Sequence, residues 1–342
     1  MKKAYFVYPS LKAGIAIALT LSGLVACRHP SKKQMSNIKD PGTEQAATNS
    51  IPFFKLSLAQ WSIHRMITRG ELDPYQFAEK AKAWRFHGLE YVSALYKEKL
   101  EPRGYSAEAM QEFVDRCNAE ATEHGLENLL IMVDGEGDLA TSDIDARIQA
   151  VANHYKWVDA AQAMGCHSIR VNLWGSNEPD QWISNSVDGL TRLCTYAENK
   201  NINILVENHG GLSSNAQMLA RVIQEVGMKN CGTLPDFGNF CIRRNDPKNW
   251  HSGCAEMYDR YQGIRELMPY AKAVSAKSYN FDIEGNETEI DFARMLSLIK
   301  AAGYTGYIGV EYEGNELGEE AGILATRDLL LKAQSKNLTA VP

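Results

Sequence analysis

The most constraining feature of this chain is a repeated alternation of short apolar segments with longer amphipathic ones, which begins near residue 53 and recurs eight times. The apolar segments predict strands at residues 55–61, 89–92, 128–133, 168–173, 202–206, 232–234, 272–277 and 307–311. The amphipathic segments between them predict helices, and the one after the sixth strand is expected at residues 255–268. Strands joined by helical crossovers run parallel in one sheet.

Eight strand–helix units predict a (β/α)₈ TIM barrel, an α/β fold, as a single domain over residues 53–335. This length is close to the roughly 250 residues typical of that fold. An open, doubly wound sheet is the alternative architecture. It is weakened because no glycine-rich nucleotide-binding loop follows any of the predicted strands.

The first 52 residues differ in character from the rest. Lys2 and Lys3 precede an apolar run over residues 14–26, which is too short to cross a bilayer and is typical of an export signal. The run ends in Leu24-Val25-Ala26-Cys27, which resembles the bacterial lipobox, where cleavage before the cysteine accompanies lipidation of its thiol. We therefore predict a signal peptide at residues 1–26, and a lipidated Cys27 with a flexible tether at residues 27–52. The expected location is a bacterial cell membrane, periplasmic or outer-membrane facing, with the lipid anchor as the only membrane contact.

Charge also divides between these two parts. The chain has 36 Lys and Arg against 42 Asp and Glu, but seven of the basic and only two of the acidic residues lie in the first 50. The net charge of −6 therefore becomes −11 for the residues that follow. An acidic domain repels phosphate backbones, so nucleic acid is not an expected partner.

Six cysteines follow Cys27, and they show no zinc-binding spacing. We expect them to be small buried apolar residues on helices and strands. A disulfide among Cys231, Cys241 and Cys254 is the one bridge worth testing.

Polar residues stand at the carboxyl end of the predicted strands, the face of a TIM barrel where active sites lie. In a closed barrel, the carboxylates of Glu207, Asp236 and Glu311 would converge near the axis. Clustered carboxylates repel one another unless a cation holds them, so they indicate a divalent metal. Three separate ion pairs are the structural alternative. The complete set of strand-end residues is Gln60, Glu90, Asp134, Asn172, Glu207, Asp236, Lys277 and Glu311.

With these motifs, the chain from residue 53 to about 333 resembles the xylose isomerase-like TIM barrels, sugar isomerases and epimerases that share their fold with endonuclease IV. That family's metal ligands are a Glu ending strand five, an Asp ending strand six, a His on strand seven and a Glu ending strand eight. Glu207, Asp236 and Glu311 match three of them, but Ser275 stands in place of the strand-seven His. Asn239 likewise replaces a His three residues after the Asp. The resemblance thus implies a metal held by carboxylates and water, and such an oxygen-rich set favours Mn²⁺ or Mg²⁺ over Zn²⁺.

The resemblance also implies the chemistry. Glu207 and Glu311 act as base and acid and move a proton next to a sugar carbonyl that the metal polarises. Lys277 either stabilises the developing oxyanion or only neutralises a carboxylate. His209 completes the metal site or contacts substrate, and Arg170 is expected to form a structural ion pair. The residues expected to contact substrate are His209, Asn239, Asn172, Trp61 and Gln60.

Many members of this family act on sugar phosphates, but the loops after strands seven and eight argue against such a substrate here. Barrel phosphate sites are built from these two loops. In this chain they carry carboxylates that would repel a phosphate, namely Asp282, Glu284, Glu287, Glu313 and Glu316. The expected small-molecule carbohydrate partner is therefore a non-phosphorylated sugar or keto-sugar. Two alternatives stay open: a lyase or hydrolase of glycosides or keto-glycosides on the same barrel, and a sugar-binding lipoprotein without catalytic activity.

Overall fold

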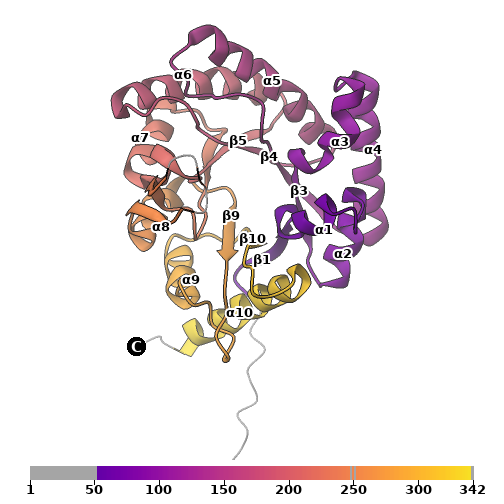
Figure 1. Ribbon diagram of the computed structural model, residues 1–342, viewed down its shortest axis with the longest axis vertical. Helices are drawn as coiled ribbons and strands as arrows, with labels where there is room; N and C mark the ends of the chain where they lie inside the picture. Colours follow the sequence, from indigo (N-terminus) through magenta and orange to yellow (C-terminus); the bar gives the residue numbers. More distant parts are fainter. Residues whose placement is uncertain (1–51, 247–248, 250–251, 340–342) are drawn as a thin grey trace, which may run out of the picture. The chain divides into compact units, whose positions relative to one another are not determined.

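The computed structural model describes residues 52–246, 249 and 252–339. Eight parallel strands form one sheet in the order β6-β5-β4-β3-β2-β1-β10-β9. Figure 1 shows this sheet curling into a ring inside a layer of helices. The two end strands are joined by short parallel bridges, Thr233 with Ala271 and Asp236 with Ser275. The fold is therefore the expected TIM barrel.

The parallel strands are β1 (Lys55–Ala59), β2 (Gly88–Val92), β3 (Glu127–Met132), β4 (Ser168–Val171), β5 (Asn203–Glu207), β6 (Cys231–Leu234), β9 (Val274–Ser278) and β10 (Tyr307–Tyr312). The helices are α1 (His64–Thr68), α2 (Phe77–Ala83), α3 (Lys97–Leu100), α4 (Ala107–His124), α5 (Ile144–Ala163), α6 (Pro179–Glu198), α7 (Ala216–Val226), α8 (Arg260–Leu267), α9 (Phe292–Ala301) and α10 (Glu319–Thr339). A separate antiparallel hairpin consists of β7 (Cys241–Arg244) and β8 (Cys254–Met257).

Local sequence signals set the starts of several helices. The Asp73 side chain accepts a hydrogen bond from the Tyr75 amide and forms a capping box with Gln76 at the turn before α2. Ser106 and Asp143 accept backbone hydrogen bonds at the starts of α4 and α5. These polar side chains satisfy amide groups that have no partner within the helix.

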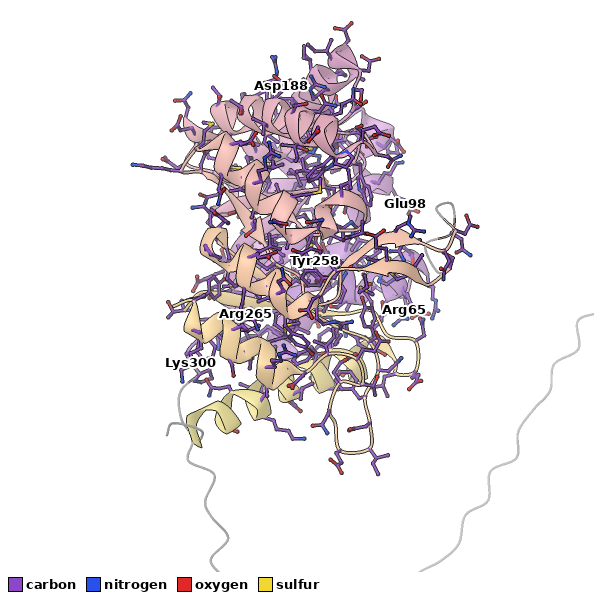
Figure 2. All side chains as sticks on the ribbon, turned by 90° about the vertical axis from the view of Figure 1, so that its left-hand side faces the viewer. Arg65, Glu98, Asp188, Tyr258, Arg265 and Lys300 are labelled. Carbon is purple, nitrogen blue, oxygen red and sulfur yellow. A yellow bond between two sulfur atoms is a disulfide. The ribbon has the colours of Figure 1, made fainter. Side chains whose placement is uncertain are left out.

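The segment after β6 differs from the prediction of a helix at residues 255–268. Its first residues instead pair with β7 as strand β8, and α8 begins only at Arg260. A disulfide between Cys241 and Cys254, with Cα atoms 5.7 Å apart, joins the two strands. Figure 2 shows the hairpin projecting from the barrel on the side where Arg65 is labelled. The helical interpretation was wrong because the apolar pattern of α8 is too short to fix its start, whereas cross-strand pairing and the disulfide fix residues 254–257 in a strand.

The cysteine expectation is therefore correct in part. Cys117, Cys166, Cys194 and Cys231 are free and buried, as predicted. Cys241 and Cys254 instead form a bridge, drawn from the three cysteines singled out for testing.

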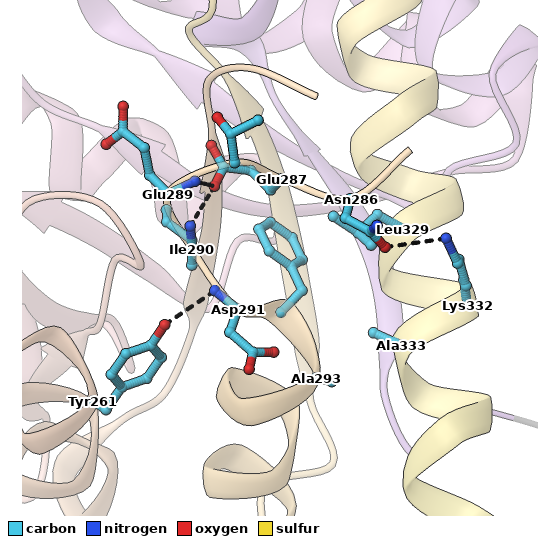
Figure 3. Close-up of a pocket in the computed structure, with 12 residues that line it drawn as sticks. Tyr261, Asn286, Glu287, Glu289, Ile290, Asp291, Ala293, Leu329, Lys332 and Ala333 are labelled. Atoms are coloured by element: carbon cyan, nitrogen blue, oxygen red, sulfur yellow. Dashed lines mark hydrogen bonds between the residues drawn. The ribbon is translucent and has the colours of Figure 1, made fainter. Parts of the chain in front are cut away.

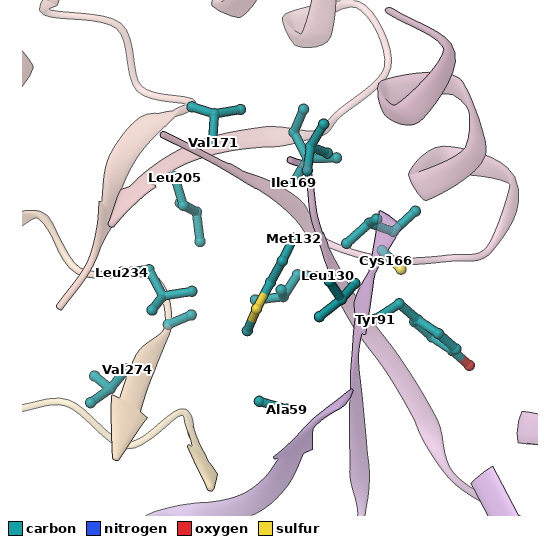
Figure 4. Packing of buried hydrophobic residues seen from close by; sticks show 14 of the residues in the cluster. Ala59, Tyr91, Leu130, Met132, Cys166, Ile169, Val171, Leu205, Leu234 and Val274 are labelled. Carbon is teal, nitrogen blue, oxygen red and sulfur yellow. The ribbon is translucent and has the colours of Figure 1, made fainter. Parts of the chain in front are cut away.

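The barrel interior contains both apolar and charged side chains. Figure 4 shows Met132, Leu205 and Leu234 pointing into the ring, whereas Ile169 and Val171 point outward. Because successive side chains of a strand point to opposite faces, the outward direction of Ile169 places Arg170 inside the barrel. The apolar residues fill the interior, and the charged ones gather around the candidate site described below.

The predicted signal peptide, Cys27 and nearly all of the predicted tether lie outside the described residues. In the described part of the chain, no helix combines the length and apolar character needed to cross a membrane.

Candidate active site

Three carboxylates meet at the carboxyl end of the barrel strands. Glu207 ends β5, Asp236 follows β6, and Glu311 lies near the end of β10. One oxygen atom from each lies within 4.8 Å of the others, and all three side chains are buried. The strand-end position of these residues predicted this convergence, because parallel strands bring their carboxyl ends to one edge of the sheet.

Ser275, on β9, bridges two of these carboxylates. Its Oγ lies 2.7 Å from Oδ2 of Asp236 and 2.6 Å from Oε2 of Glu311. A hydroxyl group has one hydrogen to donate, so the second short contact requires a proton on one of the two carboxyl groups. Burial raises the pKa of Asp236 to about 8, against the opposing charge of Lys277. In the absence of a bound cation, burial therefore favours the protonated form of Asp236.

Asp236 is fixed in place by several hydrogen bonds. Its Oδ1 accepts from the backbone amides of Gly238 and Asn239, both at 2.8 Å. The Asn208 side chain accepts from the Asp236 amide at 2.8 Å and donates to the Asp236 carbonyl at 3.0 Å. Asn208 is fully buried and was not predicted for the site. Its position directly after Glu207 was the available signal.

Arg170 holds a second part of the site together. Its guanidinium forms ion pairs with Glu207 at 2.9 Å and with Asp134 at 2.8 Å. Burial alone would raise the pKa of Asp134, but the charge and hydrogen bond of Arg170 lower it. Burial raises the pKa of Glu207 to about 7, although Arg170 opposes this shift. The predicted ion pair of Arg170 is present, and one of its partners is a candidate catalytic residue.

Lys277 is almost completely buried, with 1% of its side chain exposed. Its Nζ lies 3.5 Å from a Glu311 oxygen and 3.3 Å from a Glu313 oxygen. Burial acts to lower the pKa of Lys277, yet Asp236, Glu311 and Glu313 together hold it well above its usual value. Lys277 is therefore a permanent positive charge next to the carboxylate cluster.

The three clustered carboxylates have the donor chemistry of a divalent metal site. Among the described residues, Glu207 and Glu311 each pair with one basic side chain, whereas Asp236 pairs with none. Buried carboxylates in excess of their cationic partners need either protons or a bound cation. The donors are oxygen atoms, which suit Mn²⁺ or Mg²⁺. Glu207, Asp236 and Glu311 are thus the residues that could hold a metal.

A cavity of about 240 Å³ opens beside the cluster. Trp61 and His209 line it together with Arg170, Lys277 and Glu311. Burial, with the nearby charges of Arg170 and Lys277, lowers the pKa of His209 to about 4, so its imidazole is neutral at physiological pH. The structure therefore brings two of the five predicted substrate contacts, Trp61 and His209, to the wall of this inner cavity.

The three predicted amide contacts lie elsewhere. Asn239 donates to Glu207 at 2.9 Å, so its side chain contacts the carboxylate cluster directly. Asn172 donates to Asp134 at 2.8 Å and positions the partner of Arg170. Gln60 is fully buried. Its side-chain amide donates hydrogen bonds to the Pro74 carbonyl and the Tyr96 hydroxyl and accepts one from the Val92 amide. The prediction that Gln60 contacts substrate is not supported, because the strand ends two residues earlier than expected and a turn directs this side chain into the core.

Glu90, another predicted strand-end residue, lies buried in the barrel interior. Its Oε1 accepts from the Ser57 hydroxyl at 2.6 Å, and its Oε2 has no hydrogen-bond partner among the described residues. A Cβ atom at Gly309 would lie 2.5 Å from this oxygen, so glycine provides the space that Glu90 occupies. Burial raises the pKa of Glu90 to about 8. Glu90 is therefore a neutral carboxylic acid at pH 7.

This protonated acid predicts a specific pH dependence of stability. Between about pH 4.5 and 8, folded Glu90 retains a proton that the unfolded chain has released, so stability falls as pH rises through this range. Glu90→Gln is expected to remove this component, which is on the order of 1 kcal/mol per pH unit. Urea unfolding from pH 5 to 8 measures it, with exposed Glu98→Gln as control. An unchanged slope in the Glu90 variant would contradict a raised pKa.

One acidic residue of the loops after β9 and β10 does not face the mouth of the barrel. Figure 3 shows the Glu287 carboxylate accepting hydrogen bonds from the backbone amides of Glu289 and Ile290. It lines a separate cavity of about 410 Å³ between its own loop and α10. Glu287 is 8% exposed, so the expectation that it repels a phosphate was wrong for this residue. Glu313, by contrast, does line the inner cavity.

Comparisons with known proteins agree with this architecture. The family model described as xylose isomerase-like TIM barrel matches residues 78–333. Similar solved structures include the IolI protein with a bound zinc atom, at 14% identity and a TM-score of 0.61, covering 83% of this chain and 99% of that one. A D-tagatose 3-epimerase-like protein has 16% identity and a TM-score of 0.59, covering 84% and 100%. The 3-keto-D-glucoside 4-epimerase YcjR from E. coli has 14% identity and a TM-score of 0.57, covering 76% and 94%. No curated protein sequence matches the chain.

Proposed function

Because the chain belongs to the family of xylose isomerase-like TIM barrels, we propose that it is a metal-dependent isomerase or epimerase of a non-phosphorylated sugar or keto-sugar. The observation that carries this proposal is the meeting of Glu207, Asp236 and Glu311 beside a cavity that also contains a buried lysine. The solved sugar epimerases with the same fold support the reaction class.

The two glutamates, Glu207 and Glu311, would carry out the proton transfer. Mn²⁺ or Mg²⁺ bound by the three carboxylates would polarise the sugar carbonyl and acidify the adjacent C–H group. Glu207 and Glu311 come from different strands, so one can remove the proton and either can return it. Return to the neighbouring carbon gives isomerisation, and return to the opposite face gives epimerisation.

The buried cations stabilise the charge that develops on the substrate. Lys277 lies beside Glu311 and lines the cavity, so its ammonium group can stabilise an oxyanion without reorganising. Arg170 also lines the cavity, and its ion pair with Glu207 holds the orientation of that carboxylate. Trp61, whose ring stacks on His64, lines the cavity wall and provides an apolar surface for a sugar ring.

Deuterium exchange tests this proposal directly. The protein with Mn²⁺ in D₂O should incorporate deuterium next to the carbonyl of at least one sugar in a panel of ketoses, aldoses and 3-keto-glycosides. Mass spectrometry detects the label, and product analysis separates isomerisation from elimination of a glycosidic group. Absence of exchange and of product with every sugar would favour a non-catalytic binding protein.

We also propose that the chain is exported and anchored through a lipid on Cys27. The disulfide between Cys241 and Cys254 supports this location, because disulfides persist mainly in oxidising compartments. Cells supplied with a radiolabelled fatty acid should incorporate label into the wild-type protein and none into Cys27→Ala. Equal labelling of both proteins would exclude Cys27 as the lipidation site.

A further inference from the structure

A second, larger cavity lies outside the first, at the base of the β7–β8 hairpin. Its volume is about 650 Å³, and both disulfide-bonded residues, Cys241 and Cys254, form part of its wall. Arg65 of α1 and Asn315 of the loop after β10 contribute other parts of the wall. In Figure 2 the hairpin and Arg65 lie on the same side of the molecule. The hairpin thus adds a chamber that eight strand–helix units alone would not form.

The two cavities share residues of their walls. Trp61 and Glu313 line both of them. Gly210 and Asn239 line the outer cavity, whereas the adjacent His209 lines the inner one and the Asn239 side chain contacts Glu207. A ligand held at the carboxylate cluster can therefore extend past Trp61 into the outer chamber.

The charge of the outer wall is mainly positive. Arg65, Arg244 and Arg260 line it, against the carboxylates of Glu289 and Glu313. Of these, Arg65 is already paired with Glu319, and Glu313 is paired with Lys277.

Arg260 is the residue in this wall that points most clearly to a ligand. It is the first residue of α8, directly after the N-cap Asp259. Its Nη1 atom is buried and has no hydrogen-bond partner among the described residues. Because Nη1 is enclosed, a ligand in the cavity would meet the other two nitrogens of this guanidinium, which also have no partner among the described residues. A carboxylate matches such a planar pair of donors with two parallel hydrogen bonds.

We propose that the outer cavity is a subsite for a second sugar unit that carries a carboxylate, held by Arg260 with support from Arg244. This inference rests on the proposed function, because it places the reacting ring in the inner cavity. The substrate would then be a glycoside with an acidic outer unit rather than a free monosaccharide. A carboxylate is preferred over a phosphate because Glu289 and Glu313 repel a dianion more strongly than a monoanion.

Calorimetric binding to the full chain with Mn²⁺ tests the subsite without requiring turnover. The probes are glucose, cellobiose and cellobiouronic acid, which has a carboxylate in place of the hydroxymethyl group of the non-reducing unit of cellobiose. The wild type is expected to bind cellobiouronic acid roughly tenfold or more tightly than cellobiose, as a charge-assisted hydrogen bond provides. Arg260→Met should bind the two disaccharides equally, with an unchanged Kd for cellobiose. Arg260→Lys, which keeps the charge but loses the planar fork, should show an intermediate preference.

Arg243→Met is the matched control, because Arg243 lies on the same hairpin but pairs with Glu256 and does not line the cavity. It should retain the full preference for the acidic disaccharide.

Equal affinity of the wild type for both disaccharides would overturn the subsite. An unchanged preference for the acidic disaccharide in both Arg260 variants would overturn it as well. Binding of glucose 6-phosphate as tight as that of cellobiouronic acid would overturn the carboxylate assignment. The two proposals are tested separately. If the subsite is absent, deuterium exchange into a monosaccharide is still expected. If the isomerase proposal is wrong, selective binding of the acidic disaccharide is still expected.

Discussion

Replacement of Glu311 by Gln is expected to reduce deuterium incorporation into the substrate by about 10²- to 10⁴-fold, the usual contribution of a positioned acid or base. Gln keeps the size of the side chain and an oxygen acceptor for Ser275, which lies 2.6 Å away. It cannot take up a proton at neutral pH. Mass spectrometry of the sugar after incubation in D₂O, with Mn²⁺ at saturating concentration, measures the loss.

The matched control for Glu311→Gln is Glu316→Gln, which changes an exposed carboxylate five residues further along the same loop. It should exchange at the wild-type rate.

Lys277→Met in the same assay should lower kcat by about 10²- to 10³-fold if its ammonium group stabilises the oxyanion. Wild-type exchange in Glu311→Gln would remove this residue from the proton transfer, whatever the effect at Lys277.

Replacement of Asp236 by Asn is expected to weaken Mn²⁺ binding by more than about 100-fold, because changes in residues that only support metal ligands already cost 10- to 100-fold. Asn preserves the Oδ1 acceptor that receives the amides of Gly238 and Asn239, so the local backbone is retained. Electron paramagnetic resonance of free Mn²⁺ measures the affinity without an activity assay. Thermal unfolding should show a Mn²⁺-dependent rise in Tm for the wild type and none for the variant.

Ser275→Ala provides the comparison for Asp236→Asn. It removes the hydroxyl that bridges Asp236 and Glu311 but leaves all three carboxylates in place. Its loss of Mn²⁺ affinity should stay within about 10- to 100-fold. Equal Mn²⁺ affinity in wild type and Asp236→Asn would show that Asp236 is not a ligand, and undetectable binding in the wild type would favour the non-catalytic alternative.

Some site residues were predictable because their side-chain direction follows from strand position. Glu207, Asp236 and Glu311 each follow an apolar strand, and the closed sheet brings them within 4.8 Å. Gln60 occupied an equivalent place in the sequence, but β1 ends at Ala59 and the next turn directs Gln60 into the core. A small error in a predicted strand end changes the predicted direction of a side chain, because alternate residues of a strand face opposite sides.

Other parts of the site depend on contacts between distant segments. Asn208 follows β5 and forms two hydrogen bonds with the backbone of Asp236, a contact that its place next to Glu207 does not specify. The β7–β8 hairpin lies within a single loop, where its four-residue strands are too short for a periodic signal. The outer cavity, with Arg260 in its wall, exists only once that hairpin is folded against the barrel.

Hydrophobic periodicity and strand-end position are local properties that repeat along the chain, so the barrel, its eight parallel strands and the three carboxylates at their ends could be predicted from the residues alone. How the charges of these carboxylates are balanced could not be predicted in this way. Arg170 pairs with Glu207, Lys277 pairs with Glu311, and Ser275 bridges Glu311 and Asp236. Burial leaves a fourth carboxyl group, that of Glu90, as a neutral acid. The physical reason is that the charge state of a buried group depends on desolvation and on neighbours a few ångströms away, which are brought together from distant parts of the chain only by folding.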